Sequence, residues 1–377
     1  MPGAAVGPVV QLSAANQPPD AALPTARALL RFGVVADVQY ADLDEGTNFL
    51  RTVTRYYRHA GEALQQAVRC WLAHGLLQDQ EEPVAFVAQL GDLIDGLNAY
   101  QEPPQTAAAS ATVMRWLHPL HEVGIPVHHV RHTAAVPTAI WCREGVPGRL
   151  RMWSQVVGNH EVMNFTRAEL HAAPLPAEAT AAGGASFFSG GTPGEQRRAA
   201  AAAAEAAAAG ASITARPELT FPCAVDDPGG EQGFRSYHSF VHPTLTTWRF
   251  IVLDAFAIST LGWADDHPNS IAAWALLAEH NPNDCRASGV NLLAGMEGVE
   301  SRWMPYNGAY GEVQLRWLAE ELAEAHEAGQ RVVVLTHVGV QPGCCLDDNL
   351  AWDYAEVKSV LHSVGPGVRI SHQIAAW

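Results

Sequence analysis

Four short motifs in this chain each begin with a run of apolar residues and end in polar side chains. In order along the sequence they are GVVADVQY at 33–40, FVAQLGDLIDG at 86–96, QVVGNHE at 155–161 and RVVVLTH at 331–337. Short apolar runs bounded by polar residues and glycines are typical of buried β-strands. The motifs therefore predict four strands whose ends bring polar side chains together, and this arrangement requires a fold with a layered sheet.

The polar residues at these predicted strand ends are of types that bind divalent metal ions. Two of them, Asp37 and Gln39, are separated by one residue, so both side chains can face the same side of an extended segment. Carboxylate, amide and imidazole groups that converge from several strands suit a pair of divalent cations. The predicted metal ligands are Asp37, Gln39, Asp92, Asn159 and His337.

Four neighbours of these ligands have predicted supporting roles. Gly91 directly precedes the aspartate of the second motif, where a residue without a side chain permits the backbone to approach a metal cluster closely. His160 adjoins a ligand without being needed as one, so it is the predicted general acid or transition-state stabiliser. Asp95 is expected to brace its loop, and Glu161 is expected to support the ligands without contacting a metal.

Each predicted ligand also has an ordinary structural explanation when it is taken alone. Asp37 or Asp92 could cap a helix or lie in a turn, and the Gly-Asn pair that contains Asn159 is a common turn former. His337 could be a hydrogen-bonded core histidine, and Gln39 could lie on the surface. The functional interpretation is favoured because all of these residues occur at strand ends.

The rest of the chain alternates between predicted strands and helices, which indicates an α/β layered fold. Segment 51–77 has apolar residues at helical spacing, and segment 311–328 has the same pattern with Gly329 as the expected stop. Region 257–310 is rich in Asn, Pro and Gly and is expected to be a long loop. The other predicted strands are 31–36, 84–90, 125–129, 236–241, 247–256 and 331–336, and the other predicted helices are 107–123 and 352–362.

The chain is expected to form one domain, at 29–377, after a disordered leader at 1–28. Two segments interrupt the pattern and are predicted insertions. Segment 130–155 has no periodicity of either kind, and segment 173–216 is dominated by Ala and Gly, with a poly-Ala run at 199–209. Poly-Ala favours helix intrinsically, but without an apolar stripe it has no face to pack.

Composition and charge exclude several classes of function. The formal net charge is −16, so a polyanion such as duplex nucleic acid would be repelled at long range. Bound metals can still make one pocket locally positive, so a small phosphate ester remains a suitable partner. No stretch approaches the ~20 apolar residues of a membrane span, so a membrane-spanning helix is not expected. None of the cysteines forms a C-x-x-C pair, which argues against a zinc ribbon and a disulfide framework. No signal peptide is recognisable at the N-terminal segment. A cytoplasmic location is therefore expected.

The order D-x-Q, GD-x-x-D, GNHE and then a strand-terminal histidine resembles the calcineurin-like metallophosphoesterase superfamily. The resemblance implies an α/β/β/α sandwich and a site with two metals ~3.5–4 Å apart that clamp the phosphoryl oxygens and lower the pKa of a bridging water. It implies that Asp92 bridges the metals and that Asn159 and His337 bind the second one. Protonation of the leaving group would be the task of His160.

Further segments resemble one family within that superfamily, the manganese-dependent ADP-ribose/CDP-alcohol diphosphatases. They are ADLDEGTNFLRTVTRYYRHA at 41–60, FRSYHSFV at 234–241, NPND at 281–284 and LAWDYAEV at 350–357, and the resemblance covers roughly 31–129, 156–171 and 233–363. It implies Mn²⁺ as the cofactor and hydrolysis of the pyrophosphate bond in a small nucleotide such as ADP-ribose or a CDP-alcohol.

Two residues of the first of these segments are predicted to contact the substrate. Phe49 could stack on a base, and Arg55 could hold a distal phosphate or ribose. The alternative interpretation of both residues is helix packing and a solvated helix face.

The sequence departs from the superfamily pattern at its end, where a Gly-His-x-His motif would supply one imidazole to each metal. That motif is absent, and His362 and His372 are the only histidines after His337. The sandwich is therefore expected to be C-terminally incomplete, with weakened metal binding. The Val-Arg pairs at 130–131 and 368–369 suggest that 130–155 and 368–377 are retained-intron sequence. Two alternative interpretations of the function remain open. The chain could be a catalytically impaired isoform that binds a nucleotide or partner, or it could be a phosphoesterase with another ester substrate.

Overall fold

The computed structural model describes residues 30–48, 53–75, 84–123, 125, 127–128, 156–165, 167, 170, 236–242, 245–363 and 370–375. The expected leader at 1–28 and the expected insertions at 130–155 and 173–216 lie outside the described residues. The division into a leader, one domain and two insertions therefore stays a prediction.

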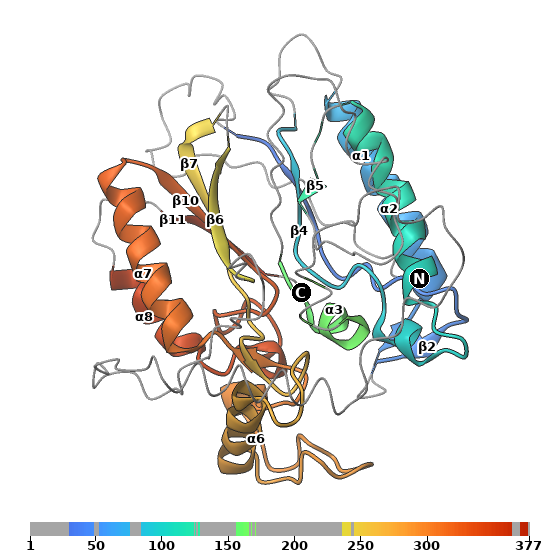
Figure 1. Ribbon diagram of the computed structural model, residues 1–377, viewed down its shortest axis with the longest axis vertical. Helices are drawn as coiled ribbons and strands as arrows, with labels where there is room; N and C mark the ends of the chain where they lie inside the picture. Colours follow the sequence, from blue (N-terminus) through green and yellow to red (C-terminus); the bar gives the residue numbers. More distant parts are fainter. Residues whose placement is uncertain are drawn as a thin grey trace, which may run out of the picture.

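The first sheet has three parallel strands in the order β1 (Gly33–Val35), β4 (Val87–Gln89) and β5 (Val127–His128). Helices α1 (Tyr57–Gly75) and α2 (Thr106–Glu122) lie side by side against one face of this sheet (Figure 1). Their apolar residues recur every three or four positions, so each helix buries one stripe. The buried stripes include Leu64, Val68 and Trp71 of α1 and Val113, Leu117 and Leu120 of α2.

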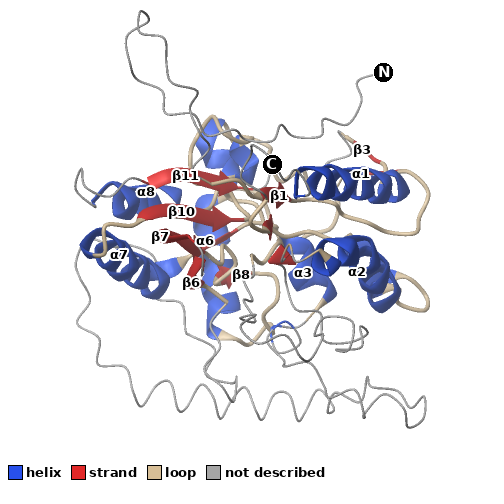
Figure 2. Ribbon diagram, turned by 90° about the horizontal axis from the view of Figure 1, so that it is seen from above, coloured by secondary structure: helices blue, strands red, loops and turns tan. Residues whose placement is uncertain are grey.

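The second sheet has four strands in the order β11 (Ile370–Ala375), β10 (Arg331–Thr336), β7 (Leu245–Val252) and β6 (His238–His242). β10 pairs in parallel with β7 and β11, and β6 is antiparallel to β7. Helices α7 (Gly311–Glu327) and α8 (Tyr354–Ser363) cover its outer face (Figure 2). As predicted, the apolar stripe of α7 is buried and Gly329 follows the helix end with φ of 63°, the left-handed conformation of a helix stop.

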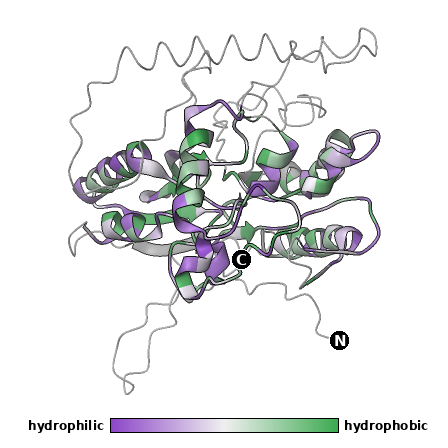
Figure 3. Ribbon diagram, turned by 90° about the horizontal axis from the view of Figure 1, so that it is seen from below, coloured by the Kyte–Doolittle hydropathy of each residue, from purple (hydrophilic) through white to green (hydrophobic). Residues whose placement is uncertain are grey.

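The two sheets pack face to face through apolar side chains. Phe86 beside β4 meets Phe250 of β7 edge to face, with ring centroids 4.9 Å apart. Residues of the same cluster come from β4 and β10 as well, including Ala88, Val333 and Leu335. The layers therefore run helix, sheet, sheet, helix, and the predicted α/β/β/α sandwich is confirmed. Figure 3 shows hydrophobic and hydrophilic residues alternating around the helices, as a fold with one buried face per helix requires.

Two expectations about helices were wrong. The helix expected from residue 51 begins at Tyr57, because Thr54–Arg55 form strand β3, which pairs antiparallel with β2 (Gly46–Thr47). Val53 and Tyr56, which were counted in its apolar stripe, are more than half exposed. The expected long loop at 257–310 contains helix α6 (Pro268–His280), which starts with a proline in its first turn after His267 accepts a hydrogen bond from a helix amide. The helix was not predicted because the segments on either side of α6 are rich in Asn, Pro and Gly and dominate the average composition of 257–310.

The end of the chain, where the sandwich is expected to be incomplete, contributes one strand to the second sheet. β11 adds a strand beside β10, with Ala375 paired to Thr336. A short antiparallel pair, β8 (Ile258–Ser259) with β9 (Gly308–Ala309), lies next to α6. Among the described helices, none combines the length and the apolar character that a membrane crossing needs.

Candidate metal centre

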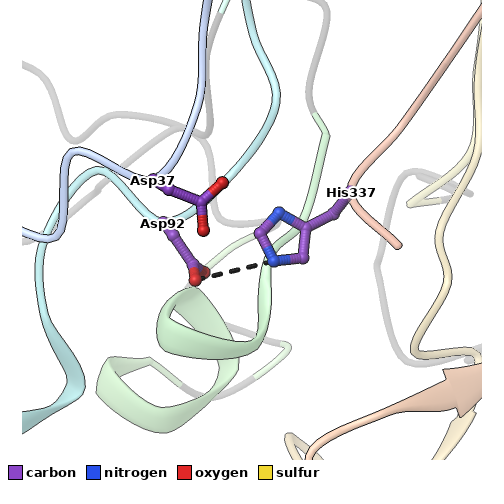
Figure 4. A group of neighbouring side chains, drawn as sticks. All are labelled: Asp37, Asp92 and His337. Atoms are coloured by element: carbon purple, nitrogen blue, oxygen red, sulfur yellow. Dashed lines mark ion pairs between the residues drawn. The ribbon is translucent and has the colours of Figure 1, made fainter. Parts of the chain in front are cut away.

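The predicted ligands meet where the two sheets come together, at the carboxyl ends of β1, β4 and β10 and at the start of helix α3 (Asn159–Asn164). The strand predicted for the third motif was wrong, since 156–158 form no strand and Asn159 is the first residue of α3. The ligand atoms of Asp37, Asp92 and His337 all lie within 4.8 Å of one another (Figure 4). Asp37 follows β1, Asp92 follows β4 and His337 follows β10 directly. The sequence motifs are thus brought together from both halves of the sandwich, and this is the only such group among the residues that the structure describes.

The backbone at this site is in an unfavourable conformation. Asp37, Gln39 and Asp92 have φ of 53°, 48° and 59°, and within the described ranges they are the only residues other than glycine with positive φ. A left-handed non-glycine residue costs ~1–3 kcal/mol and persists only where the surroundings impose it. Here the two loops bind each other, since the Asp37 amide donates to the Gly91 carbonyl at 3.1 Å and the Gln39 amide donates to the Asp92 carbonyl at 2.8 Å. Strain concentrated on three predicted ligands supports a functional role for them.

Gly91 is held in a position that no other residue fits. Its φ is 105°, and a Cβ atom there would lie 2.6 Å from Nδ1 of His337 and 2.8 Å from the backbone nitrogen of Gly158. This close approach agrees with the role that the sequence analysis expects of Gly91.

The imidazole of His337 is oriented by a backbone group. Its Nδ1–H donates to the Leu90 carbonyl at 2.8 Å, so Nε2 faces the other ligands. Nε2 lies 3.1 Å from Oδ1 of Asn159 and 3.5 Å from Oδ2 of Asp92. A histidine whose second nitrogen is fixed by a carbonyl is typical of metal ligands.

Asp92 and Glu161 are fixed by hydrogen bonds from the backbone. Oδ1 of Asp92 accepts from the amide of His160 at 2.8 Å. The Glu161 carboxylate accepts from the amides of Asp92 at 2.5 Å, Gly158 at 2.9 Å and Leu93 at 3.0 Å. Glu161 therefore holds two motifs together, in agreement with the supporting role expected of it.

Several ionisable groups at the site have displaced pKa values. Burial is the main cause that raises the pKa of Asp37 to about 7, and burial together with Asp92 raises the pKa of Glu161 to about 8. Burial opposes ionisation of Asp92, but His160 and His337 outweigh it and keep its pKa below the usual value. Burial likewise opposes the charged form of His337, yet the surrounding carboxylates raise its pKa. Crowded carboxylates of this kind are what a bound cation would neutralise.

The residues present fit a divalent cation. Oδ2 of Asp37 is buried and has no hydrogen-bond partner among the described residues, although it faces the other ligands. A cation would satisfy that oxygen together with Asp92 and His337. Gln39 donates from Nε2 to Asp37 Oδ1 and to Asp92 Oδ2, both at 3.1 Å. The exchange of its amide oxygen and nitrogen, which ordinary structures do not distinguish, would present Oε1 as a ligand.

His160 lies at the edge of this group. Its Nδ1 accepts from the Gly96 amide at 2.6 Å, and its Nε2 lies 3.7 Å from Oδ2 of Asp92. Because Nδ1 accepts, the neutral ring carries its proton on Nε2, on the side of the metal ligands. His160 is therefore placed to donate a hydrogen bond into the site.

Arg55 approaches the same edge from β3. Its Nη1 lies 3.6 Å from Oδ2 of Asp95, which is itself 3.5 Å from Nδ1 of His160. Asp95 braces its loop as expected, since Oδ1 accepts from the Leu97 amide at 2.8 Å at the start of η1 (Gly96–Tyr100). The alternative interpretation of Arg55 as part of a helix face is wrong, because Arg55 is in a strand and its side chain is only 20% exposed. Phe49 lies outside the described residues.

The two histidines after His337 are placed differently. His362 is exposed near the end of α8. His372 lies within β11, opposite Val333, and its side chain is not described.

Sequence reasoning missed a buried ion pair beside the site, between Arg167 and Asp254. Asp254 directly follows the apolar run of β7, which is the same signal that identified Asp92. The arginine has no such signal, because its partner is distant in sequence.

A two-sheet α/β/β/α sandwich with carboxylate and imidazole groups at the strand ends, and an amide at the start of α3, defines the class of metal-dependent phosphoesterases. No protein-family model matches the chain. A manganese-dependent ADP-ribose/CDP-alcohol diphosphatase of Arabidopsis thaliana is 31% identical over 350 residues, which are 93% of this chain and 78% of that protein. The proteins of the same description from Danio rerio and Homo sapiens are 29% and 28% identical, over 88% and 92% of this chain and 77% and 76% of theirs.

A solved structure extends the likeness to three dimensions. The crystal structure of a dimetal phosphatase from Danio rerio superposes with a TM-score of 0.56 at 28% identity and covers 88% of this chain and 77% of its own. The chain belongs to the family of manganese-dependent ADP-ribose/CDP-alcohol diphosphatases, and the resemblance stated from the motifs is confirmed.

Proposed function

We propose that this protein hydrolyses the pyrophosphate bond of nucleoside diphosphate-linked small molecules, such as ADP-ribose and CDP-alcohols, with Mn²⁺ at a two-metal site. The observation that carries the proposal is the convergence of Asp37, Asp92 and His337 within 4.8 Å in a chain of this family. The buried Oδ2 of Asp37, which has no hydrogen-bond partner in the part of the chain that the structure describes, supports the presence of a cation.

Each predicted site residue has a task in this reaction. Asp37, Gln39, Asp92, Asn159 and His337 would hold the metals. When bound, the metals supply positive charge for the phosphoryl oxygens and lower the pKa of water. The chain's own part is to hold these ligands rigidly, and the hydrogen bonds of Glu161 and of the Leu90 carbonyl serve that purpose.

The remaining residues act on the substrate. His160 would donate a hydrogen bond from Nε2 to the leaving phosphate oxygen, because its Nδ1 is occupied by the Gly96 amide. Arg55 would bind a distal phosphate or ribose from its place 3.6 Å from Asp95. Phe49 would stack on the base, which needs no sequence-specific hydrogen bonds.

The test is hydrolysis of ADP-ribose and CDP-choline in the presence of Mn²⁺. The expected products are AMP with ribose 5-phosphate, and CMP with phosphocholine, because water adds across the pyrophosphate bond in each case. Asp92→Asn should abolish turnover, since it removes the charge of a carboxylate that would hold the metals. A simple phosphomonoester and a cyclic nucleotide serve as control substrates. Turnover of either one in preference to ADP-ribose and CDP-choline would contradict the proposal.

We also propose a cytoplasmic location. The described cysteines, Cys70, Cys285, Cys344 and Cys345, are all free thiols, which suits a reducing compartment. Fractionation of the source cells followed by detection of the protein would test this location.

A further inference from the structure

The candidate metal centre is divided between the two sheets of the sandwich. Asp37 and Asp92 follow strands of the first sheet, whereas His337 follows β10 of the second. A functional constellation has to be held within about 0.5 Å of its productive geometry. The distance between the two sheets at this edge therefore determines whether the ligands can bind metals together.

Arg167 joins the two halves beside the site. It lies three residues after α3 (Asn159–Asn164), the short helix that presents Asn159 and His160. Its Nη1 forms an ion pair with Oδ2 of Asp254, and its Nη2 donates to the Phe256 carbonyl at 2.5 Å. Both partners belong to the segment that follows β7 of the second sheet. Arg167 is 4% exposed and Asp254 is fully buried, so the contact is dry.

The far side of this link is anchored firmly in the second sheet and its helix layer. Asp254 donates from its amide to Gln314 of α7 at 2.8 Å, and its carbonyl accepts from the Gln314 amide group at 2.8 Å. The Asp254 carboxylate also accepts from Ser236 at 2.5 Å and from the Phe256 amide at 2.9 Å. Asp254, which follows β7, is therefore bound both to α7 and to Ser236, two residues before β6.

The link reaches the metal ligands through two packing contacts. The ring of Phe256 lies 5.9 Å from the ring of His337, centroid to centroid. The Arg167 guanidinium lies 4.6 Å from the ring of Trp263, and the adjacent Gly262 packs so closely on α3 that a Cβ atom would lie 2.8 Å from Cβ of Val162. The segment that supports His337 is thus pressed against the helix that presents Asn159.

We propose that Arg167 is a positioning residue for the metal centre. By joining α3 to the end of β7, it sets the separation of Asn159 and His337 and thereby the affinity of the site for Mn²⁺. This inference rests on the proposed metal site. A stabilising role alone is a weaker account of the pair, because a buried ion pair contributes little net stability compared with apolar residues of similar size.

The test compares two arginine-to-lysine substitutions. Arg167→Lys keeps the charge for Asp254, but a single ammonium group cannot serve Asp254, the Phe256 carbonyl and the Trp263 face together. Arg249→Lys is the matched control, because Arg249 also forms a fork, with Glu321 at 2.5 Å and Gln330 at 2.9 Å, but only within the second half of the sandwich. Mn²⁺ affinity is measured from the electron paramagnetic resonance signal of the free ion, and the thermal midpoint is measured in EDTA.

The expected result is a loss of Mn²⁺ affinity of roughly tenfold or more in Arg167→Lys, as for other groups that orient metal ligands. Arg249→Lys should keep the Mn²⁺ affinity of the unsubstituted protein, even if its thermal midpoint falls as far as that of Arg167→Lys. Equal affinities in the two variants would overturn the inference. If Arg167→Lys fails to fold, the double variant Arg167→Met with Asp254→Asn, which leaves no buried charge unpaired, should show the same loss, and retention of affinity there would also overturn it.

The proposed function can fail separately. An unsubstituted protein that binds no Mn²⁺ overturns both the metal site and this inference. An unsubstituted protein that binds Mn²⁺ but hydrolyses no diphosphate overturns the proposed function alone, because the comparison of affinities needs no substrate.

Discussion

At the scale of single residues, the site depends on backbone positions that few side chains tolerate. Three predicted ligands adopt left-handed conformations, and Gly91 lies where a side chain would meet His337. Such strain is stable only when many contacts impose it. The geometry of the predicted ligands therefore depends also on residues, such as Gly91, that are not themselves predicted ligands.

Gly91→Ala should disrupt the metal centre, with a loss in the free energy of unfolding of about 1–3 kcal/mol, because it adds a clash to a strained backbone. Gly329→Ala is the control, since Gly329 also has positive φ, at 63°, but nothing lies within 4 Å of its Cβ position. Both variants are measured by urea unfolding and by Mn²⁺ binding. The control should lose some stability and bind Mn²⁺ normally, and an equally intact metal site in Gly91→Ala would contradict this explanation.

Tyr310→Phe tests how the neighbours of His337 are held. The buried Tyr310 hydroxyl donates to the Val338 carbonyl at 3.0 Å and shares a hydrogen bond of 2.6 Å with Thr336. Its removal should cost about 1–2 kcal/mol of unfolding free energy and weaken Mn²⁺ binding. Tyr306→Phe removes a hydroxyl that contacts Asp348 instead, at 3.0 Å, and should leave Mn²⁺ binding unchanged. Indistinguishable Mn²⁺ affinities of Tyr310→Phe and Tyr306→Phe would show that the Tyr310 hydroxyl has no part in holding His337.

At the scale of elements, periodicity predicted those parts that bury one clear face. The helix α7 and the strand β10 fall where the leucine spacing and the RVVVLT run place them. The helix α6 escaped prediction because its flanks are loop-like and its own start signal is a single Pro268. The β3 strand escaped because its pairing partner, β2, supplies the hydrogen bonds that decide between strand and helix.

For the site as well, residues with a local sequence signal were predictable and residues that depend on a distant partner were not. The positions of Asp37, Asp92 and His337 were predictable because each ends a recognisable strand. Arg167 was not, because its role depends on Asp254, which lies 87 residues further along the chain.

Asn281→Asp should loosen the segment between α6 and η4 (Gly298–Arg302). The Asn281 side-chain nitrogen donates to the carbonyls of Leu292 at 3.2 Å and Trp303 at 2.9 Å. A carboxylate of the same shape would face both carbonyls with negative charge, at a local cost of about 2–3 kcal/mol. Hydrogen exchange should become faster across 282–303 and stay unchanged in β10, and uniform protection in both regions would count against this role.

At the scale of the whole molecule, the sandwich has to hold two sheets together at the edge where its ligands lie. Apolar packing between Phe86 and Phe250 joins the sheets in their interior. At the edge, polar contacts join the sheets as well, among them the Leu90 carbonyl with His337 and the Arg167–Asp254 pair. The Arg167–Asp254 pair should respond to pH, because it depends on the charge of the Asp254 carboxylate.

The Asp254 carboxylate should make the protein less stable in acid. Burial opposes its ionisation, but the Arg167 charge and the hydrogen bonds of Ser236 and Phe256 outweigh burial and hold its pKa below the ordinary 3.8. Because the folded-state pKa is lowered, the stability contributed by Asp254 is present above pH 3.8 and is lost as the pH falls through the folded-state value. Asp254→Asn should lack this part of the acid dependence, and at pH ~7 it should lose about 3–5 kcal/mol because Arg167 is left unpaired.

The measurement is the free energy of unfolding in urea, for the unsubstituted protein and for Asp254→Asn, at intervals from pH ~7 to pH ~3 in EDTA. Other buried carboxylates contribute slopes of their own, since burial raises the pKa of Asp353 to about 7. Those slopes are common to both proteins, so the difference between the two curves isolates Asp254. The difference in unfolding free energy between the two proteins should narrow only below pH 3.8, where the Asp254 carboxyl of the unfolded chain takes up protons before that of the folded protein does. If the difference in unfolding free energy between the two proteins stays constant down to the lowest pH, Arg167 does not hold Asp254 in its charged form.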